Sequence, residues 1–505
     1  MRVKHFLRLM ALCLAAMMLL PLGAALAASD GYSNSYTYNY DYWGELRESP
    51  DAYRVDQVIY SGSLGLETAM RKPQSLFVIG EDLYVCDTGN NRVLHVHREG
   101  DSFALVRIID TVHGAEPSGF SNPGDVAVDA SGNIYVADTG NNRVVMMDKD
   151  QNFVRAYVKP TDNTFDQNLG FLPNRIVVDT SGRVFVLATN VNKGLIKFEA
   201  DGTFTGFIGA NQVSYNLWDY IWKSFFTTKE QRAQQASFVP TEYENIYIDG
   251  DGFIYATNTV FSEYDLLYDV AKPIRRLNSI GNDILIKNDR YPPIGDLDWV
   301  PESLDYGPTK FKDITVLEND IYIAVDRTRG RLFGYDPQGI MLWAFGNKGN
   351  NAGCFLSAVS VEHMGTDLFV LDENENSITV FTPTEYGSLI YKASDEYLRG
   401  DYEGSADTWR EVLKLNANYN LAFIGIGRSL LRQEQYKEAM DYFKMAHDRE
   451  NYGRAYRYYR KEVVERNIIW IVVVIACLLI VPPIIQFVKK SKAEVEAYER
   501  RKIAR

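Results

Sequence analysis

The residues best suited to chemistry are the carboxylates, amides and arginines of one hexapeptide that occurs twice. Asp-Thr-Gly-Asn-Asn-Arg stands at Asp87–Arg92 and again at Asp138–Arg143. Its Asp could cap a turn, Asn and Gly tolerate positive φ, and Arg can brace neighbouring loops. A calcium site is conceivable, but the spacing does not indicate one. We expect a structural role first, and the loop residues that could also contact a ligand are Asp87, Asn91, Arg92, Asp138, Asn142 and Arg143.

Catalytic motifs are otherwise scarce. His95 and His97 alternate along one segment and could share a metal, but no third ligand is evident near them. His113 and His363 stand alone, and the sequence contains no nucleophile elbow, zinc helix or phosphate loop. The sequence therefore favours a protein that is not an enzyme and indicates no cofactor.

Aromatic residues gather in two long insertions. In the first, apolar residues follow helical spacing and form a stripe: Trp218, Ile221, Trp222, Phe225 and Phe226. The other, residues 288–310, is the third of three predicted insertions (210–238, 261–272 and 288–310) and adds Tyr291, Trp299 and Tyr306. Such side chains either pack on the rest of the fold or form a platform for a sugar or a partner helix. Trp218, Trp222, Tyr291 and Trp299 are therefore candidate ligand-binding residues.

The elements that must position these residues are short strands in a repeated unit. Leu83–Val93 recurs almost letter for letter as Ile134–Val144, and weaker copies begin at Val184, Ile254, Ile321 and Leu368. Apolar residues alternate along each copy and along the segment before it, and Gly, Asn and Asp stand at the turns. This pattern is typical of short antiparallel strands.

The two strong copies resemble the NHL repeat family, which implies a mainly β fold. Six units between residues 53 and 381 predict a six-bladed β-propeller, with four strands in each blade. The last unit has only three strands, so residues 53–60 should supply its fourth and close the ring. The repeated hexapeptides and the insertions fall in loops that should share one face, which is the candidate binding face.

The remaining segments predict a helical domain, an export signal and a membrane anchor. Residues 382–465 change to a helical period and resemble two tetratricopeptide repeats, because Trp409 and Phe443 stand 34 positions apart. Residues 1–27 form a signal peptide, 28–52 a flexible Tyr-, Ser- and Asn-rich leader, 468–488 a transmembrane helix and 489–505 a basic tail. The signal places the N-terminal domains outside the cell membrane and the tail in the cytoplasm.

Charge excludes one class of partner. The net charge is −13; residues 1–27 carry three basic residues and residues 489–505 carry seven basic and three acidic ones, which leaves about −20 between them. Nucleic acid should therefore be repelled. Cys86 and Cys354 could form a disulfide outside the cell, although two buried thiols are the simpler expectation.

The layout of signal, propeller, helical repeat and anchor resembles bacterial membrane-tethered propellers that accompany sugar transporters of the ABC type. This resemblance implies a single-pass recognition or scaffold protein. Its partner would be a protein, such as a permease or a solute-binding protein, and a carbohydrate ligand is also conceivable. The alternative is a hydrolase or lyase similar to lactonases or streptogramin lyases, with a metal in the central channel.

Overall fold

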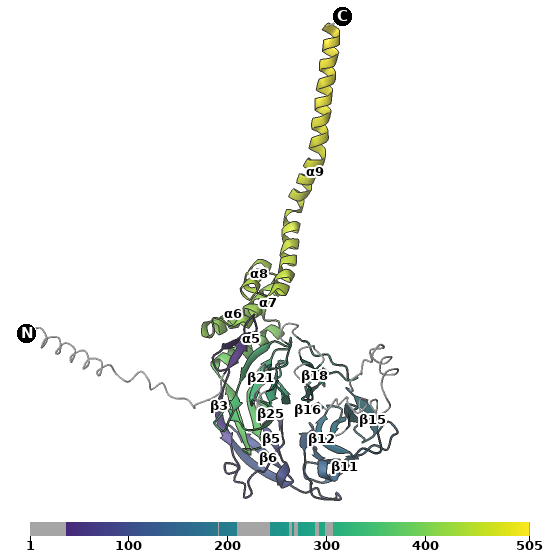
Figure 1. Cartoon of the computed structure of the whole chain (residues 1–505), viewed down its shortest axis with the longest axis vertical. Helices are drawn as coiled ribbons and strands as arrows, with labels where there is room; N and C mark the ends of the chain where they lie inside the picture. Colours follow the sequence, from purple (N-terminus) through teal and green to yellow (C-terminus); the bar gives the residue numbers. More distant parts are fainter. Residues whose placement is uncertain are drawn as a thin grey trace, which may run out of the picture. The chain divides into compact units, whose positions relative to one another are not determined.

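The computed structural model describes residues 37–189, 191–209, 243–261, 265–266, 271–287, 292–297 and 307–503 (Figure 1). The signal segment, residues 1–27, lies outside them. The chain forms two compact units. The first contains the described residues up to Asn39 and Asp51–Gly387, and the second contains Tyr40–Pro50 and Ser388–Arg505.

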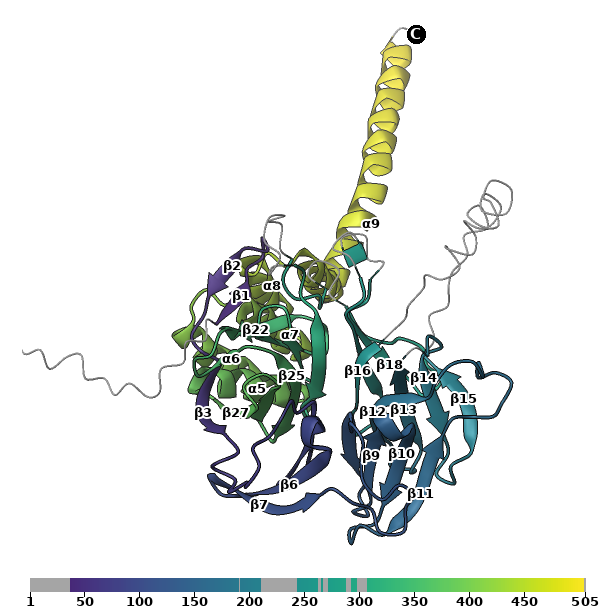
Figure 2. The same ribbon diagram turned by 60° about the horizontal axis from the view of Figure 1, so that its bottom comes forward.

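The first unit is a six-bladed β-propeller built from antiparallel sheets (Figure 2). Each blade begins at its innermost strand and proceeds outward along the chain. Blade 1 consists of β4 (Ser75–Ile79), β5 (Asp82–Asp87), β6 (Arg92–Glu99) and β7 (Ser102–Ile109). Blade 2 consists of β8 (Asp125–Val128), β9 (Ile134–Asp138), β10 (Arg143–Met147) and β11 (Phe153–Val158). Blade 3 consists of β12 (Leu172–Val178), β13 (Val184–Thr189), β14 (Leu195–Phe198) and β15 (Phe204–Ile208). Blade 4 contains β16 (Tyr243–Ile248), β17 (Ile254–Asn258) and β18 (Ile274–Leu277). Blade 5 contains β19 (Phe311–Val316), β20 (Tyr322–Asp326), β21 (Arg331–Tyr335) and β22 (Met341–Phe345). Blade 6 contains β25 (Ala358–Met364), β26 (Asp367–Asp372) and β27 (Ser377–Pro383).

The ring closes through a strand from the start of the propeller. The innermost strands β4, β8, β12, β16, β19 and β25 each contact the next, and β25 contacts β4. The fourth strand of blade 6 is β3 (Tyr53–Ile59), which pairs with β27 from Ile378↔Ile59 to Pro383↔Tyr53. The predicted closure by this segment is confirmed, and it joins the two ends of the propeller in one sheet.

Two blades depart from the predicted four strands. The described part of blade 4 has three regular strands, and Ile284 adds one irregular hydrogen bond from its N–H to the carbonyl of Arg276, 2.7 Å. Blade 5 has a fifth strand, β1 (Tyr38–Tyr40), whose Tyr38 pairs with Ala344 of β22. The prediction of a flexible leader over residues 28–52 is therefore wrong for its described part. Tyr38 is fully buried, and residues 46–48 form the strand β2 (Leu46–Glu48).

Strand alternation divides the core between neighbouring blades. On β5, Leu83 and Val85 pack in a cluster with Phe369 of blade 6. Tyr84 and Cys86, the intervening residues, belong to the cluster with Val136 of blade 2. Because successive side chains leave a strand on opposite sides, each blade stabilises two interfaces at once.

The second unit is helical. Its helices are α5 (Glu385–Leu398), α6 (Tyr402–Leu415), α7 (Asn420–Arg432), α8 (Tyr436–Met445) and α9 (Arg449–Ile503). Two glycines of α7 allow close helix packing: a Cβ on Gly425 would lie 2.4 Å from Nε1 of Trp409, and one on Gly427 would lie 2.6 Å from Cε1 of Phe443. The helical prediction for this region is confirmed at the level of helices.

Helix α9 is continuous from the helical unit into an apolar stretch. It includes residues 468–488, whose large apolar side chains are exposed, and it carries Pro482 and Pro483 within it (Figure 1). By length and composition α9 could cross a membrane. The helix predicted over residues 468–488 is thus part of a longer helix that begins in the helical unit.

Candidate functional site

The repeated hexapeptides form brackets between a blade and the chain that leads into it. Oδ1 of Asp87 accepts the backbone N–H of Arg71 at 2.7 Å, and Oδ2 accepts Nε of Arg92 at 2.7 Å and Nδ2 of Asn90 at 2.9 Å. Arg92 also donates to the carbonyl of Thr68, 2.6 Å. Both Asp87 and Arg92 are buried. The bracing role predicted for the arginine is confirmed, whereas the aspartate caps the preceding link and not its own turn.

The second hexapeptide repeats this geometry in blade 2. Asp138 accepts the N–H of Ser121 at 2.8 Å and Nε of Arg143 at 2.8 Å, and Arg143 donates to the carbonyl of Pro117 at 2.6 Å. Asn91 and Asn142 adopt φ of 55° and 57°, as the sequence predicts. The six candidate residues of the hexapeptides are thus held in place by the fold.

The glycines of the hexapeptides have a different role from the predicted one. Neither Gly89 nor Gly140 has a positive φ. A Cβ on Gly89 would lie 2.4 Å from the carbonyl oxygen of Arg71, and one on Gly140 would lie 2.4 Å from Oγ of Ser121. Glycine is needed because the preceding link passes directly over the turn.

The same bracket recurs where the hexapeptide is lost. Asp326 accepts the N–H of Lys310 at 2.9 Å in blade 5, and Asp372 accepts the N–H of Leu356 at 2.6 Å in blade 6. The retained signal is a single Asp that ends the second strand of blades 1, 2, 5 and 6. Sequence reasoning aligned these blades by register and did not assign that role.

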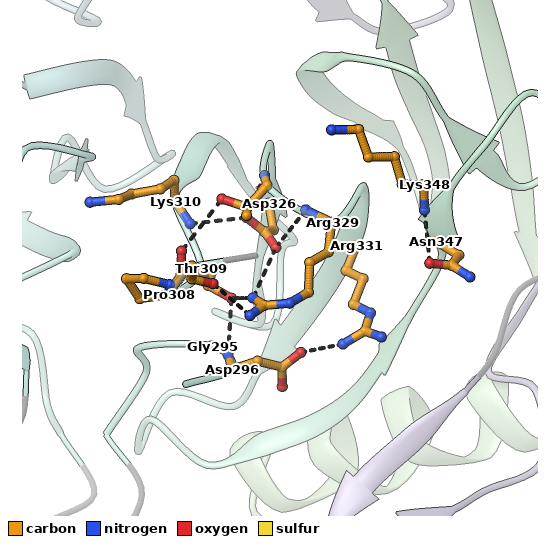
Figure 3. A network of polar contacts seen from close by, with 12 residues as sticks. Gly295, Asp296, Pro308, Thr309, Lys310, Asp326, Arg329, Arg331, Asn347 and Lys348 are labelled. Atoms are coloured by element: carbon orange, nitrogen blue, oxygen red, sulfur yellow. Dashed lines mark hydrogen bonds and ion pairs between the residues drawn. The ribbon is translucent and has the colours of Figure 1, made fainter. Parts of the chain in front are cut away.

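Blade 5 carries a polar network that fixes the link from blade 4 (Figure 3). Asp296 forms an ion pair with Arg331 and accepts a hydrogen bond from the hydroxyl of Tyr38, 2.6 Å away. Nζ of Lys310 donates to the carbonyls of Thr259 and Phe261, both at 2.6 Å, and burial lowers its pKa to about 8. The network therefore joins the fifth strand of the blade, the interblade link and the loop of blade 4.

A ring of polar side chains surrounds the propeller axis, one from the same register position of each innermost strand. We call it the polar belt, and its members are Ser75, Asp125, Arg175, Asn245, Asp313 and Ser360. All six are buried. They stand near the start of the innermost strands, on the side of the axis that the hexapeptide loops share.

The polar belt bonds blades to one another. Asp313 accepts Nδ2 of Asn245 at 2.6 Å, Oγ of Ser360 at 2.7 Å and the N–H of Val361 at 2.8 Å. Oγ of Ser360 in turn accepts the N–H of Leu76 at 3.1 Å, so blades 4, 5, 6 and 1 are linked in series.

Blades 1, 2 and 3 are linked in the same way. Asp125 accepts the hydroxyl of Ser75 and the N–H of Ile176, the latter at 2.8 Å. Arg175 donates to the carbonyl of Gly124 at 2.7 Å and to that of Gln74 at 3.2 Å. The belt carboxylates are therefore committed to holding neighbouring blades together.

Burial shifts the titration of the carboxyls near the axis. It raises the pKa of Asp313 to about 6 and raises that of Asp125. Burial, together with the charges of Asp313 and Asp125, raises the pKa of Glu362 well above its usual range. The hydroxyl of Thr315 lies 3.4 Å from Oε2 of Glu362, which makes a weak hydrogen bond. Burial lowers the pKa of the neighbouring His363 to about 4. Glu362 therefore accepts fewer hydrogen bonds from the fold than Asp125 and Asp313 do.

A cavity of ≈ 370 Å³ lies along the axis between the belt and the first turn of the blades. Belt residues line one end, and Gly80, Glu318 and Gly365, which stand in those turns, line the other. Glu362 and Tyr247 lie along its wall. The sequence did not predict this axial site, although each belt residue is a polar side chain that begins an alternating strand.

The histidine pair predicted from alternation shares one carboxylate. Oδ1 of Asp82 lies 2.9 Å from Nε2 of His95 and 2.8 Å from Nδ1 of His97. The ring of His95 stacks on Tyr84 with centroids 4.4 Å apart. Within the described ranges no three His, Cys, Asp or Glu side chains are grouped so as to hold a metal ion.

Four candidate ligand residues, Trp218, Trp222, Tyr291 and Trp299, lie outside the described residues. The other six stand at the brackets of blades 1 and 2. Cys86 and Cys354 are buried free thiols and are not bonded to each other.

The strand pairings define this chain as a six-bladed β-propeller followed by helices, one of them a candidate membrane span. The NHL repeat family matches residues 120–145, which contain the second hexapeptide. NHL repeat-containing protein 3 of the mouse is 28% identical over 141 residues, which are 26% of this chain and 40% of the mouse protein. The chain thus spans about two fifths of the length of that relative.

Solved propellers are more distant. A virginiamycin B lyase from Staphylococcus aureus shares 10% identity, with 65% of this chain and 99% of the lyase covered and a TM-score of 0.39. A Bacteroides thetaiotaomicron protein of unknown function shares 11% identity, with 69% and 76% covered and a TM-score of 0.39. A likeness at this level carries no argument about chemistry.

Proposed function

We propose that the chain is a membrane-anchored recognition protein that is not an enzyme. Its propeller binds a ligand or a protein outside the cell, its helices dock a partner, and α9 fixes it in the membrane. The observation that carries this proposal is the continuity of α9, because a helix that grows out of a folded unit into an exposed apolar stretch couples that unit to the bilayer.

The length of the apolar stretch supports the anchor. Residues 468–488 are 21 residues, which rise about 31 Å in an α-helix and match the hydrocarbon thickness of about 30 Å. Lys489, Lys490 and Lys492 follow directly. With residues 1–27 acting as an export signal, the basic tail is cytoplasmic and the propeller is outside.

The partner is proposed from layout and helix packing. Ala439 and Ala446 fill the small-residue positions of the tetratricopeptide-like pattern and are fully buried, and repeats of that kind dock other proteins. We assign as partner a component of a sugar transporter of the ABC type, either its permease or its solute-binding protein. Carbohydrate is the ligand class assigned to the loop face, with Trp218, Trp222, Tyr291 and Trp299 as its contacts.

One observation favours a second function, a hydrolase or lyase acting in the channel. Glu362 lines the axial cavity, is weakly bonded, and has a pKa raised by burial. A carboxyl group whose pKa is raised keeps its proton to higher pH and could donate it to a leaving group. The belt contacts weigh against the same role for Asp125 and Asp313, since their oxygens already accept hydrogen bonds from neighbouring blades.

The deciding experiment is extraction of the full chain from its native membrane in mild detergent. The proposal expects a permease to co-purify at near-equal amounts, and it fails if the chain is recovered alone. A glycan array probed with the full chain tests the ligand, with Trp222→Ala as the variant that should lose binding. Turnover of lactone or streptogramin substrates that is abolished in Glu362→Gln would favour the enzyme instead.

A further inference from the structure

Helix α9 carries a row of basic residues just before its apolar stretch. Arg454, Arg457, Arg460 and Lys461, which we call the basic stripe, are spaced three, six and seven positions from the first and therefore lie on one side of the helix. All four are exposed.

The basic stripe is only partly neutralised by its own helix. Arg454 pairs with Glu450 at 3.1 Å, and Lys461 lies 3.7 Å from Glu465. Within the described part of the chain, Arg457 and Arg460 have no ion-pair partner. Like charges three and four positions apart repel one another on a helix, so the stripe is unfavourable unless an external anion compensates it.

The position of the stripe indicates what that anion is. At 1.5 Å per residue, Lys461 stands about 10 Å and Arg457 about 16 Å before Ile468, where the apolar stretch begins. The polar headgroup layer adds about 5 to 8 Å beyond the hydrocarbon on each side. Long side chains extend towards such a layer, so Arg460 and Lys461 can reach the headgroups of the leaflet that α9 enters, whereas Arg454, about 21 Å before Ile468, stands outside the layer and adds charge close to it.

The net charge of the segment before the apolar stretch is unusual for the outer side of a membrane helix. Residues 452–467 carry five basic and two acidic side chains, a net +3, on the side proposed to be outside. Membrane proteins concentrate basic residues on the cytoplasmic side, so an excess on the outer side opposes that bias. A ligand that needs the charge would account for its presence.

We propose that the basic stripe binds the phosphate groups of anionic phospholipids in the outer leaflet. This inference rests on the proposed membrane anchor and adds to it a lipid selectivity. The bound lipid would hold α9 at a fixed depth and rotation relative to the bilayer surface.

The test uses the full chain reconstituted into vesicles of phosphatidylcholine with one fifth phosphatidylglycerol. Spin-labelled versions of the two lipids report how strongly each is retained at the protein surface. One basic residue near an anionic surface contributes about fivefold, so the chain should retain phosphatidylglycerol at least about fivefold over phosphatidylcholine. The preference should weaken at 1 M salt.

The matched variants remove three positive charges each. Arg457→Gln, Arg460→Gln and Lys461→Gln together should reduce the preference at least threefold. Lys392→Gln, Arg410→Gln and Lys414→Gln, three exposed residues on α5 and α6, should leave it unchanged. Equal preference in the stripe variant and the unaltered chain would overturn the proposal and would point to an acidic protein surface as the occupant.

Failure of the anchor would look different. If alkaline carbonate strips the unaltered chain from the vesicles, α9 does not span the bilayer and the proposed function itself is wrong. If the chain resists carbonate but retains both lipids equally, the anchor holds and the lipid selectivity is refuted.

Discussion

Replacing Asp313 by asparagine should remove one pH-dependent component of propeller stability. Burial in the polar belt raises the pKa of this carboxyl from 3.8 to about 6. The folded chain therefore binds the proton at a higher pH than the unfolded chain does. Stability from this group is fully present below pH 3.8 and is lost as the pH rises through about 6. A shift of roughly two pKa units corresponds to about 3 kcal/mol of unfolding free energy.

The assay is urea unfolding of the full chain in detergent at several pH values from 4.5 to 7.5, followed by tryptophan fluorescence. Across this range the free energy of unfolding of the unaltered chain should fall relative to that of Asp313→Asn by about 2 kcal/mol, because part of the stabilisation is already lost at pH 4.5. Asp56→Asn removes an exposed carboxylate on β3 and should follow the unaltered chain. Parallel pH profiles for Asp313→Asn and the unaltered chain would show that this belt carboxyl does not titrate as the geometry implies.

Three further substitutions test separate parts of the fold. Gly140→Ala should destabilise the propeller by about 1 to 3 kcal/mol, because the added Cβ meets Ser121 Oγ at 2.4 Å, and the midpoint of urea unfolding measures this. Tyr38→Phe removes the hydroxyl that donates to Asp296 and should cost about 1.5 to 3 kcal/mol, with faster hydrogen exchange in β1. Gly425→Ala should lower the melting temperature of the helical unit, since the new methyl group would overlap an indole ring.

Each substitution has a control of the same chemistry. Gly250→Ala adds a Cβ with no atom within 4 Å, and it should change stability by less than about 0.5 kcal/mol. Tyr60→Phe alters a half-exposed tyrosine and should be similarly mild. Gly453→Ala in α9 also meets no atom and should stabilise by roughly 0.5 to 1 kcal/mol. A Gly140 or Gly425 variant as stable as its control would contradict the close packing.

The propeller could be predicted because the residue types along each strand show which of its faces are buried. Successive residues along Leu83–Cys86 pack alternately in two interblade cores. Each copy of the repeat therefore needs apolar residues on both faces of its strands, and a short stretch of sequence is enough to show this. Closure followed from counting strands in the last unit. The fifth strand of blade 5 could not be counted in this way. Tyr38 is buried through Asp296, which is 258 positions away, and nothing near Tyr38 in the sequence marks that partner.

The bracket residues were predicted and the belt was missed for a similar reason. Asp87 and Arg92 belong to one turn, so their contact follows from spacing. Belt residues meet only when blades stand side by side. A signal was present nonetheless: Asp125 precedes Asp138 by 13 positions, as Asp313 precedes Asp326. A polar residue at the start of an otherwise apolar strand, repeated at one offset, indicates a position that faces the axis.

The belt also bears on where recognition can occur. Near the start of the innermost strands, a propeller enzyme would need free acids or amides, but Asp125, Asn245 and Asp313 are bonded across blade boundaries. Freeing any of them would leave buried backbone N–H groups of the next blade without acceptors, which costs about 1 to 3 kcal/mol for each group. The stability of the ring therefore disfavours a catalytic role for the belt residues. The proposed ligand contacts are therefore assigned to the hexapeptide loops and the insertions, and not to the belt.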